Sequence, residues 1–225
     1  MSPSATTQRR SKQAEFGTRA ASLAVTAGVL FALVLGFGFM LTGTGVGAAI
    51  EQVDIAVLQW LADHRTPALD AASATDLAST TVVLVGGLAV AVVASLLLRH
   101  WWPAVLMAVA LLGELAMFLS SATIVGRPRP PVAHLDPALP PTSSFPSGHT
   151  AAAICLYGGV AAIVLVSVRA WWRWLVLAAA VVMVLVVAAA RVYRAAHFPS
   201  DIVGGALLAV PWLVVTTLLV RPRER

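Results

Sequence analysis

Residues 78–98 read ASTTVVLVGGLAVAVVASLLL and contain no charged side chain. A helix needs about 20 consecutive apolar residues to cross the hydrocarbon core of a bilayer, which is about 30 Å thick. This stretch is long enough, and Arg99 follows it directly. It therefore predicts a membrane-spanning helix.

Five further stretches have the same length and character, and the only charged residue within them is Glu114. They are residues 20–41, 101–125, 150–168, 174–190 and 202–220. In a chain of 225 residues, they leave room only for tails and connections. We predict an all-α polytopic membrane protein with six transmembrane helices in one domain, residues 20–220.

The composition supports this fold class and excludes others. The chain is 59% hydrophobic and 11% charged, whereas charged residues make up about 25% of ordinary soluble domains. A soluble globule and a disordered chain are both excluded. The 15 Lys and Arg residues form no patch interleaved with aromatic side chains, so nucleic-acid binding is not expected. Cys155 is the only cysteine, which excludes an internal disulfide and a thiolate metal cluster.

The distribution of cations predicts how the chain is oriented in the cell membrane. An even number of crossings places both termini on one side, and most of the 15 cations share that side. By the positive-inside bias, residues 1–19 and 221–225 are then cytoplasmic tails. On the opposite side, residues 51–63 have the apolar spacing of a short amphipathic helix at the interface. Residues 126–148 form an extracytoplasmic loop made stiff by its many prolines.

Two segments at this outer face carry groups suited to binding an anion. In the first, Gly-Arg-Pro-Arg-Pro, Arg127 and Arg129 present planar guanidiniums that match phosphate oxygens, although they could also contact lipid headgroups. In the second, Pro-Ser-Gly-His, Ser147 is a good helix N-cap and Gly148 allows close approach of a ligand. His149 lies in the first turn, where free amides and the helix dipole attract anions.

A third outer segment supplies a second histidine. His197 precedes Asp201 by four positions, and Arg191 lies shortly before it. A carboxylate bonded to one imidazole nitrogen would aim the other at an electrophile, although a purely structural hydrogen bond is an equal alternative. Together the three segments have the groups that phosphoryl transfer through a phosphohistidine requires without a metal or cofactor. The acids there, Asp136 and Asp201, are too few for a two-metal site.

These segments resemble the type 2 phosphatidic acid phosphatase superfamily, in its membrane-embedded bacterial form. The family signatures are Lys-x6-Arg-Pro, Pro-Ser-Gly-His and Ser-Arg-x5-His-x3-Asp. The second is complete here, whereas Ala122 and Ala190 stand at the lysine of the first and the serine of the third.

The resemblance implies a role for each matched residue. His197 would be the nucleophile, Asp201 its orienting partner and His149 the general acid. The phosphate would be held by Arg129, Ser147, Gly148 and Arg191. Arg127 is the candidate to supply the charge of the missing lysine.

The expected function is hydrolysis of a lipid phosphate or diphosphate at the extracytoplasmic face. The protein would be surrounded by membrane lipids. By resemblance, the substrate would be phosphatidic acid, phosphatidylglycerol phosphate or a polyprenyl diphosphate. A phosphotransferase with the same phosphohistidine and a non-catalytic lipid- or anion-binding membrane protein are the alternatives. Glu114, an ionisable group inside a crossing, indicates either a functional role or an internal structural pair. The sequence does not indicate an oligomeric state.

Overall fold

Eight helices make up the fold that the computed structural model describes, which covers residues 5–136 and 143–222, with side chains from residue 14 onward. They are α1 (Ala5–Gly43), α2 (Gly45–Asp63), α3 (Pro67–Ser73), α4 (Thr80–Leu98), α5 (Trp102–Val125), α6 (Gly148–Ser167), α7 (Arg173–Tyr193) and α8 (Pro199–Val220). All except α2 and α3 are long and apolar enough to cross a membrane. The predicted all-α fold with six transmembrane helices is confirmed.

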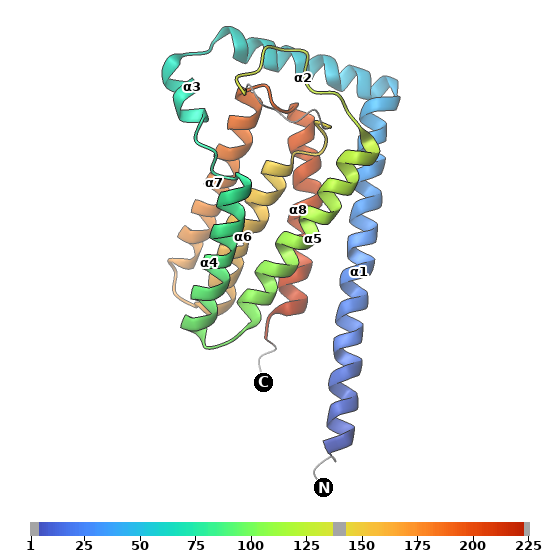
Figure 1. Cartoon of the computed structure of the whole chain (residues 1–225), viewed down its shortest axis with the longest axis vertical. Coiled ribbons are helices and arrows are strands. Elements are labelled where there is room, and N and C mark those ends of the chain that lie inside the picture. Colours follow the sequence, from blue (N-terminus) through green and yellow to red (C-terminus); the bar gives the residue numbers. More distant parts are fainter. Residues whose placement is uncertain (1–4, 137–142, 223–225) are drawn as a thin grey trace.

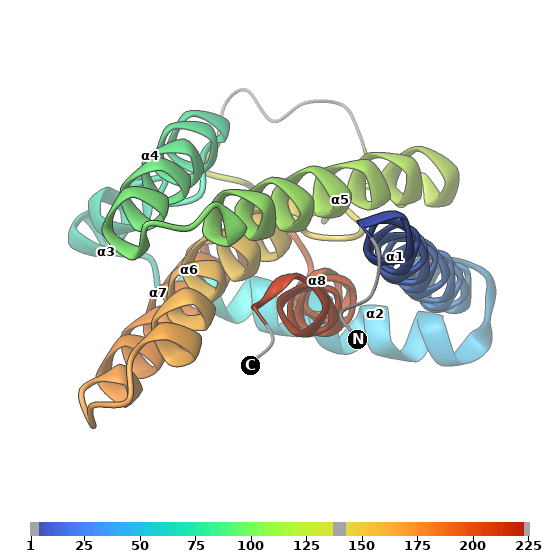
Figure 2. The same cartoon turned by 90° about the horizontal axis from the view of Figure 1, so that it is seen from below.

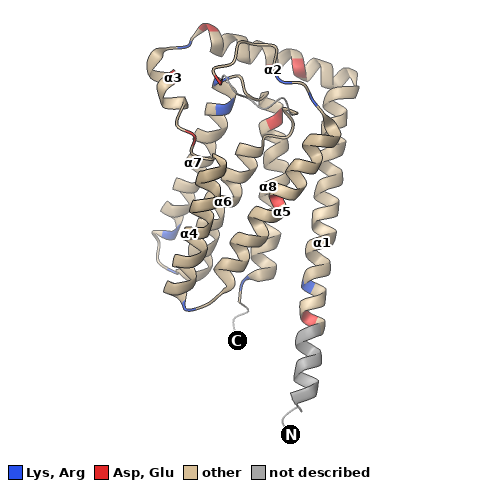
Figure 3. Ribbon diagram, viewed as in Figure 1, with Lys and Arg blue, Asp and Glu red and all other residues tan. Residues whose placement is uncertain are grey.

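The six long helices run side by side, with both chain ends at one end of the bundle and α2 lying across the other (Figure 1). Helix α6 packs against α4, α5, α7 and α8, and α8 packs in turn against α1 and α5. Seen along the bundle, α1 lies at the edge (Figure 2). Charged residues gather mainly at the two ends (Figure 3). The starts of α6 and α8 and the ends of α5 and α7 therefore lie at the end of the bundle that α2 crosses, where α2 packs against α7 and α8.

Three helices differ from the sequence prediction. Helix α1 begins at Ala5, within the segment expected to be a tail. Helix α2 includes the amphipathic segment 51–63 but begins at Gly45, where Thr44 caps it by accepting a hydrogen bond from the Gly47 amide at 3.1 Å. Helix α3 was not predicted, because its seven residues are too few to show an apolar period. Residues 137–142 of the predicted loop and most of the tail 221–225 lie outside the described residues.

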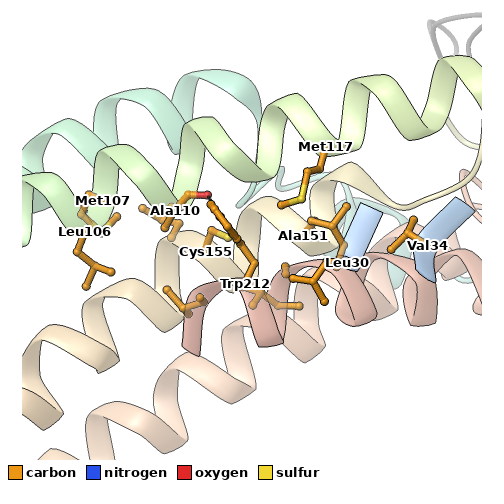
Figure 4. Packing of buried hydrophobic residues seen from close by; sticks show 14 of the residues in the cluster. Leu30, Val34, Leu106, Met107, Ala110, Met117, Ala151, Cys155 and Trp212 are labelled. Atoms are coloured by element: carbon orange, nitrogen blue, oxygen red, sulfur yellow. Dashed lines mark hydrogen bonds between the residues drawn. The ribbon is translucent and has the colours of Figure 1, made fainter. Parts of the chain in front are cut away.

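The core lies between α1, α5, α6 and α8 (Figure 4). Met107 and Ala110 of α5 face Cys155 of α6 and Trp212 of α8. The indole Nε1 of Trp212 donates a hydrogen bond to the Ala110 carbonyl at 3.1 Å, so this polar group is satisfied inside the bundle. The packing fixes α6 and α8 relative to each other, which in turn fixes the residues at their outer starts.

Candidate active site

A cavity of about 310 Å³ lies where these helix ends meet, and most of the predicted site residues line it. Its polar wall contains His149 and Gly148 from the start of α6, His197 from the α7–α8 connection, Arg191 from α7, and Arg129 from the loop after α5. Leucines of α4 and α5 form its apolar wall. The cavity thus joins two imidazoles and two guanidiniums to a hydrocarbon-like surface.

His197 is buried, and its tautomer is determined by a backbone group. Its Nδ1 atom lies 2.7 Å from the carbonyl oxygen of Ser144. A carbonyl oxygen can only accept, so Nδ1 carries the proton and donates. The Nε2 atom is then left with a free lone pair, which is the state required of a nucleophile.

The predicted pairing of His197 with Asp201 needs correction. The nearest approach, from Nδ1 of His197 to Oδ2 of Asp201, is 3.8 Å, too long for a hydrogen bond. Oδ2 of Asp201 instead accepts the Phe198 amide at 2.9 Å, and Oδ1 accepts from Arg127 at 2.7 Å. Asp201 holds the start of α8 together, while the Ser144 carbonyl orients the histidine.

The predicted role of Arg127 also needs correction. Arg127 does not line the cavity and is 1% exposed. Its Nη1 atom donates to Ser200 at 2.8 Å and to Asp201 at 2.7 Å, and its guanidinium lies 4.0 Å from the Phe198 ring centroid. The carboxylates of α2 and α8 draw the guanidinium away from the cavity. Arg127 therefore neutralises buried acids and does not replace the family lysine.

Helix α2 contributes two of the acids around Arg127. Glu51 and Asp54 lie 3.5 and 3.7 Å from its Nη2 atom, and Asp54 also accepts a hydrogen bond from the Ser200 hydroxyl. Burial raises the pKa of Asp54, and the contacts with Ser200 and Arg127 oppose that rise. This network ties α2 to the first turn of α8.

Ser147 caps α6 as predicted, but it is fully buried and does not line the cavity where it was expected to hold phosphate. Its hydroxyl accepts a hydrogen bond from the Thr150 amide at 3.4 Å, and its own amide donates to the Asp201 carbonyl at 3.0 Å. Gly148 and His149 then occupy the first two helical positions, whose amides have no acceptor within the helix. A side chain at Gly205 of α8 would come within 2.6 Å of the Ser147 carbonyl, so glycine allows this close packing.

His149 faces the other histidine and has a carboxylate partner of its own. The ring centroids of His149 and His197 are 6.4 Å apart. The Nε2 atom of His149 lies 3.3 Å from Oδ2 of Asp76, a residue just before α4 that the sequence analysis did not single out. Asp76 can thus hold the ring and stabilise its protonated form.

Arg191 and Arg129 supply the positive charge at the cavity. Arg191 is buried and lies 3.7 Å from Asp76 and 3.6 Å from Asp136, while its Nε atom has no hydrogen-bond partner among the described residues. Arg129 donates to the Ala196 carbonyl at 2.7 Å. Burial lowers the pKa of Arg129, and nearby carboxylates oppose the effect. The unpartnered Nε–H group of Arg191 is suited to an anionic oxygen.

Arg194 and Tyr193, close to Arg191 in the sequence, do not line this cavity. Arg194 lies 2.6 Å from Asp136 and donates to the Leu135 carbonyl at 3.1 Å, which fixes the loop to the end of α7. Tyr193 donates to Asp70 of α3 at 2.7 Å. Within the described ranges, 5–136 and 143–222, the protein holds no group of three or more His, Cys, Asp or Glu residues arranged to bind a metal ion.

Comparisons with known proteins identify the family and the fold. The family model of the PAP2 superfamily matches residues 103–225, which contain the motif residues. The chain is also similar to the crystal structure of a transmembrane PAP2-type phosphatidylglycerolphosphate phosphatase from Bacillus subtilis. The TM-score is 0.68 and the identity 22%, over 88% of this chain and 92% of that one. No curated protein matches the chain. From the family match, the chain belongs to the PAP2 superfamily, as a membrane-embedded phosphatase.

Proposed function

We propose that this protein hydrolyses a lipid phosphate monoester or diphosphate through a phosphohistidine formed on His197, with no metal ion. The observation that carries the proposal is the pair of imidazoles 6.4 Å apart on one cavity, one of them held with Nε2 free. A phosphoryl group placed between the rings would meet a nucleophile on one side and a proton donor on the other.

In the first step, the Nε2 lone pair of His197 attacks phosphorus. The bond from phosphorus to the lipid oxygen breaks, and the oxygen keeps the electron pair and takes a proton from His149. Because Nε2 of His149 is near Asp76, its Nδ1 atom is the one left to deliver that proton. Arg129, Arg191 and the first amides of α6 neutralise the phosphoryl oxygens as charge builds on them.

In the second step, a water molecule attacks the phosphohistidine. His149, now neutral, takes a proton from the water as the oxygen–phosphorus bond forms. The nitrogen–phosphorus bond breaks, and its electrons return to Nε2 of His197. The products are inorganic phosphate and the enzyme in its starting state.

The cavity walls support a lipid as the substrate. Its polar end lies at the helix ends, and its apolar wall lies along α4 and α5. A substrate can then keep its hydrocarbon next to the bilayer while its phosphate reaches the arginines. Phosphatidic acid, phosphatidylglycerol phosphate and polyprenyl diphosphate all have this form.

Phosphate release from a panel of these lipids in detergent micelles tests the activity. The wild type should release free phosphate, whereas the folded His197→Ala variant should release essentially none. Release at the wild-type rate by the variant would overturn the assignment of the nucleophile. Transfer of the phosphate to an added alcohol without any free phosphate would favour a phosphotransferase.

We further propose that the cavity opens on the extracytoplasmic side, which the predicted positive-inside orientation supports. A Cys155→Ser variant with the further change His134→Cys would carry one thiol, in the loop beside the cavity. In intact cells, a membrane-impermeant maleimide should label it. Labelling only after the cells are permeabilised would place the site on the cytoplasmic side.

A further inference from the structure

Glu114 is a carboxyl group inside the bundle that the proposed chemistry does not use. It lies in the membrane-spanning helix α5 and is 3% exposed. Its Oε1 atom has no hydrogen-bond partner among the residues that the structure describes. The internal pair that the sequence allowed is therefore not found there. An ionisable group without a partner in an apolar interior is unfavourable and points to function.

Glu114 lines the same cavity as His149 and His197. It stands one helical turn before Phe118, whose ring lies against Gly148 at the start of α6. Since an α-helix rises 1.5 Å per residue, four residues place Glu114 about 6 Å farther into the bundle. The carboxyl group is therefore on the path from the phosphate-binding end of the cavity to its apolar wall.

The chemistry of a carboxyl group restricts what can lie beside it. A carboxyl group held in an apolar wall needs a hydrogen-bond partner whether or not it carries a proton. A plain hydrocarbon chain would leave it unsatisfied. A hydroxyl or amino group of the substrate would satisfy it.

We propose that Glu114 binds a hydrogen-bond donor on the substrate, so that the enzyme prefers lipid phosphates with a hydroxyl or amino group close to the phosphate. This inference rests on the proposed phosphatase function. It narrows the substrate class, because phosphatidic acid and plain alkyl or prenyl phosphates have no such donor, whereas phosphatidylglycerol phosphate has a free hydroxyl. Sites that bind a substrate hydroxyl discriminate strongly against analogues that lack it, since the buried acceptor is then left unpaired.

A matched pair of substrates tests the proposal: 2-amino-3-hydroxyoctadecyl phosphate and octadecyl phosphate, which differ only in the donors. Phosphate release in detergent micelles gives kcat/KM for each. The wild type should prefer the first by about tenfold or more. In Glu114→Leu the preference should fall to near unity, whereas Glu114→Gln should keep part of it because the amide oxygen still accepts.

Leu115→Ala is the matched control, because Leu115 lines the same cavity on the same helix. It should change both rates by the same factor and leave the preference intact. Leucine at 114 removes a desolvated polar group, so thermal unfolding should show that the Glu114→Leu variant is folded. A wild-type preference near unity, or an undiminished preference in Glu114→Leu, would overturn the inference while the phosphatase function stands. Phosphate release from neither substrate would overturn both.

Discussion

The Nδ1 atom of His197 donates a hydrogen bond to the carbonyl oxygen of Ser144 at 2.7 Å. Ser144 is itself fixed: its amide donates to the Arg127 carbonyl at 2.8 Å and its hydroxyl to the Pro128 carbonyl at 2.9 Å. The loop after α5 therefore holds the acceptor, and the acceptor holds the imidazole. A backbone carbonyl has no titratable proton, so this support for the ring does not change with pH.

This contact predicts the tautomer of His197. In the resting enzyme at neutral pH, the proton should be on Nδ1, because the carbonyl can only accept. Ring ¹⁵N chemical shifts, assigned by comparison with a His197→Ala sample, measure the tautomer directly. If the proton were on Nε2 instead, that atom would have no free lone pair, and the proposal that it attacks phosphorus would be contradicted.

Arg127 should matter for stability more than for phosphate binding. Replacement by methionine leaves Asp201 and Asp54 buried without their counter-charge, which should lower the free energy of unfolding by about 3–5 kcal/mol. Thermal unfolding in detergent measures the loss. The control is Arg129→Met, which removes a cavity cation and should reduce phosphate release with a smaller change in Tm. An Arg127→Met protein as stable as the wild type would refute the structural role.

Asp76 should act on the reaction through His149. With Asp76→Asn, the ring loses a charged partner, so kcat should fall by about 10- to 100-fold. If the two residues act as one unit, adding Asp76→Asn to His149→Ala should change the residual rate very little. The measurement is a double-mutant cycle, which compares kcat of the wild type, the two single variants and the double variant. If the double variant instead loses kcat by the product of the two single losses, Asp76 acts by another route, such as through Arg191.

Close packing of α8 on the start of α6 should be needed for the site. In Gly205→Ala the new methyl group would lie 2.6 Å from the Ser147 carbonyl, which should cost about 1–3 kcal/mol and reduce activity. Gly28→Ala is the control, because nothing lies within 4 Å of its position, and there alanine should be neutral or stabilising by up to about 1 kcal/mol. Comparing Tm and kcat/KM of the two variants separates the effect of the close contact at Gly205 from the general effect of replacing glycine by alanine in a helix. Equal changes in the two variants would rule out the proposed role of close packing.

Much of the fold could be predicted because each crossing is a continuous apolar stretch. The stretch 78–98 became α4, Thr80–Leu98, with little change. The placement of His149 and His197 at the same end of the bundle could also be predicted. Successive helices cross the bilayer in alternating directions, so the segments that contain these two residues lie at one face. Helix α1 was predicted too short, because polarity marks the edge of the bilayer and does not prevent a helix from continuing.

The partners within the site could not be predicted, because they depend on three-dimensional packing. Asp76 and His149 are 73 residues apart and belong to no common pattern. The Ser144 carbonyl is a backbone group, which the side-chain sequence does not reveal. The sequence placed Arg127 and Arg129 in one loop, but the acids of α2 and α8 determine which of them turns away from the cavity.

The most direct test of the central claim is detection of the phosphoenzyme. Protein quenched within milliseconds of mixing with ³²P-labelled lipid phosphate should carry label that is stable to alkali and labile to acid, as expected for a phosphoramidate. Peptide mapping should place the label on His197, and the folded His197→Ala variant should carry none. Label on another residue, or undiminished labelling of His197→Ala, would contradict the phosphohistidine account.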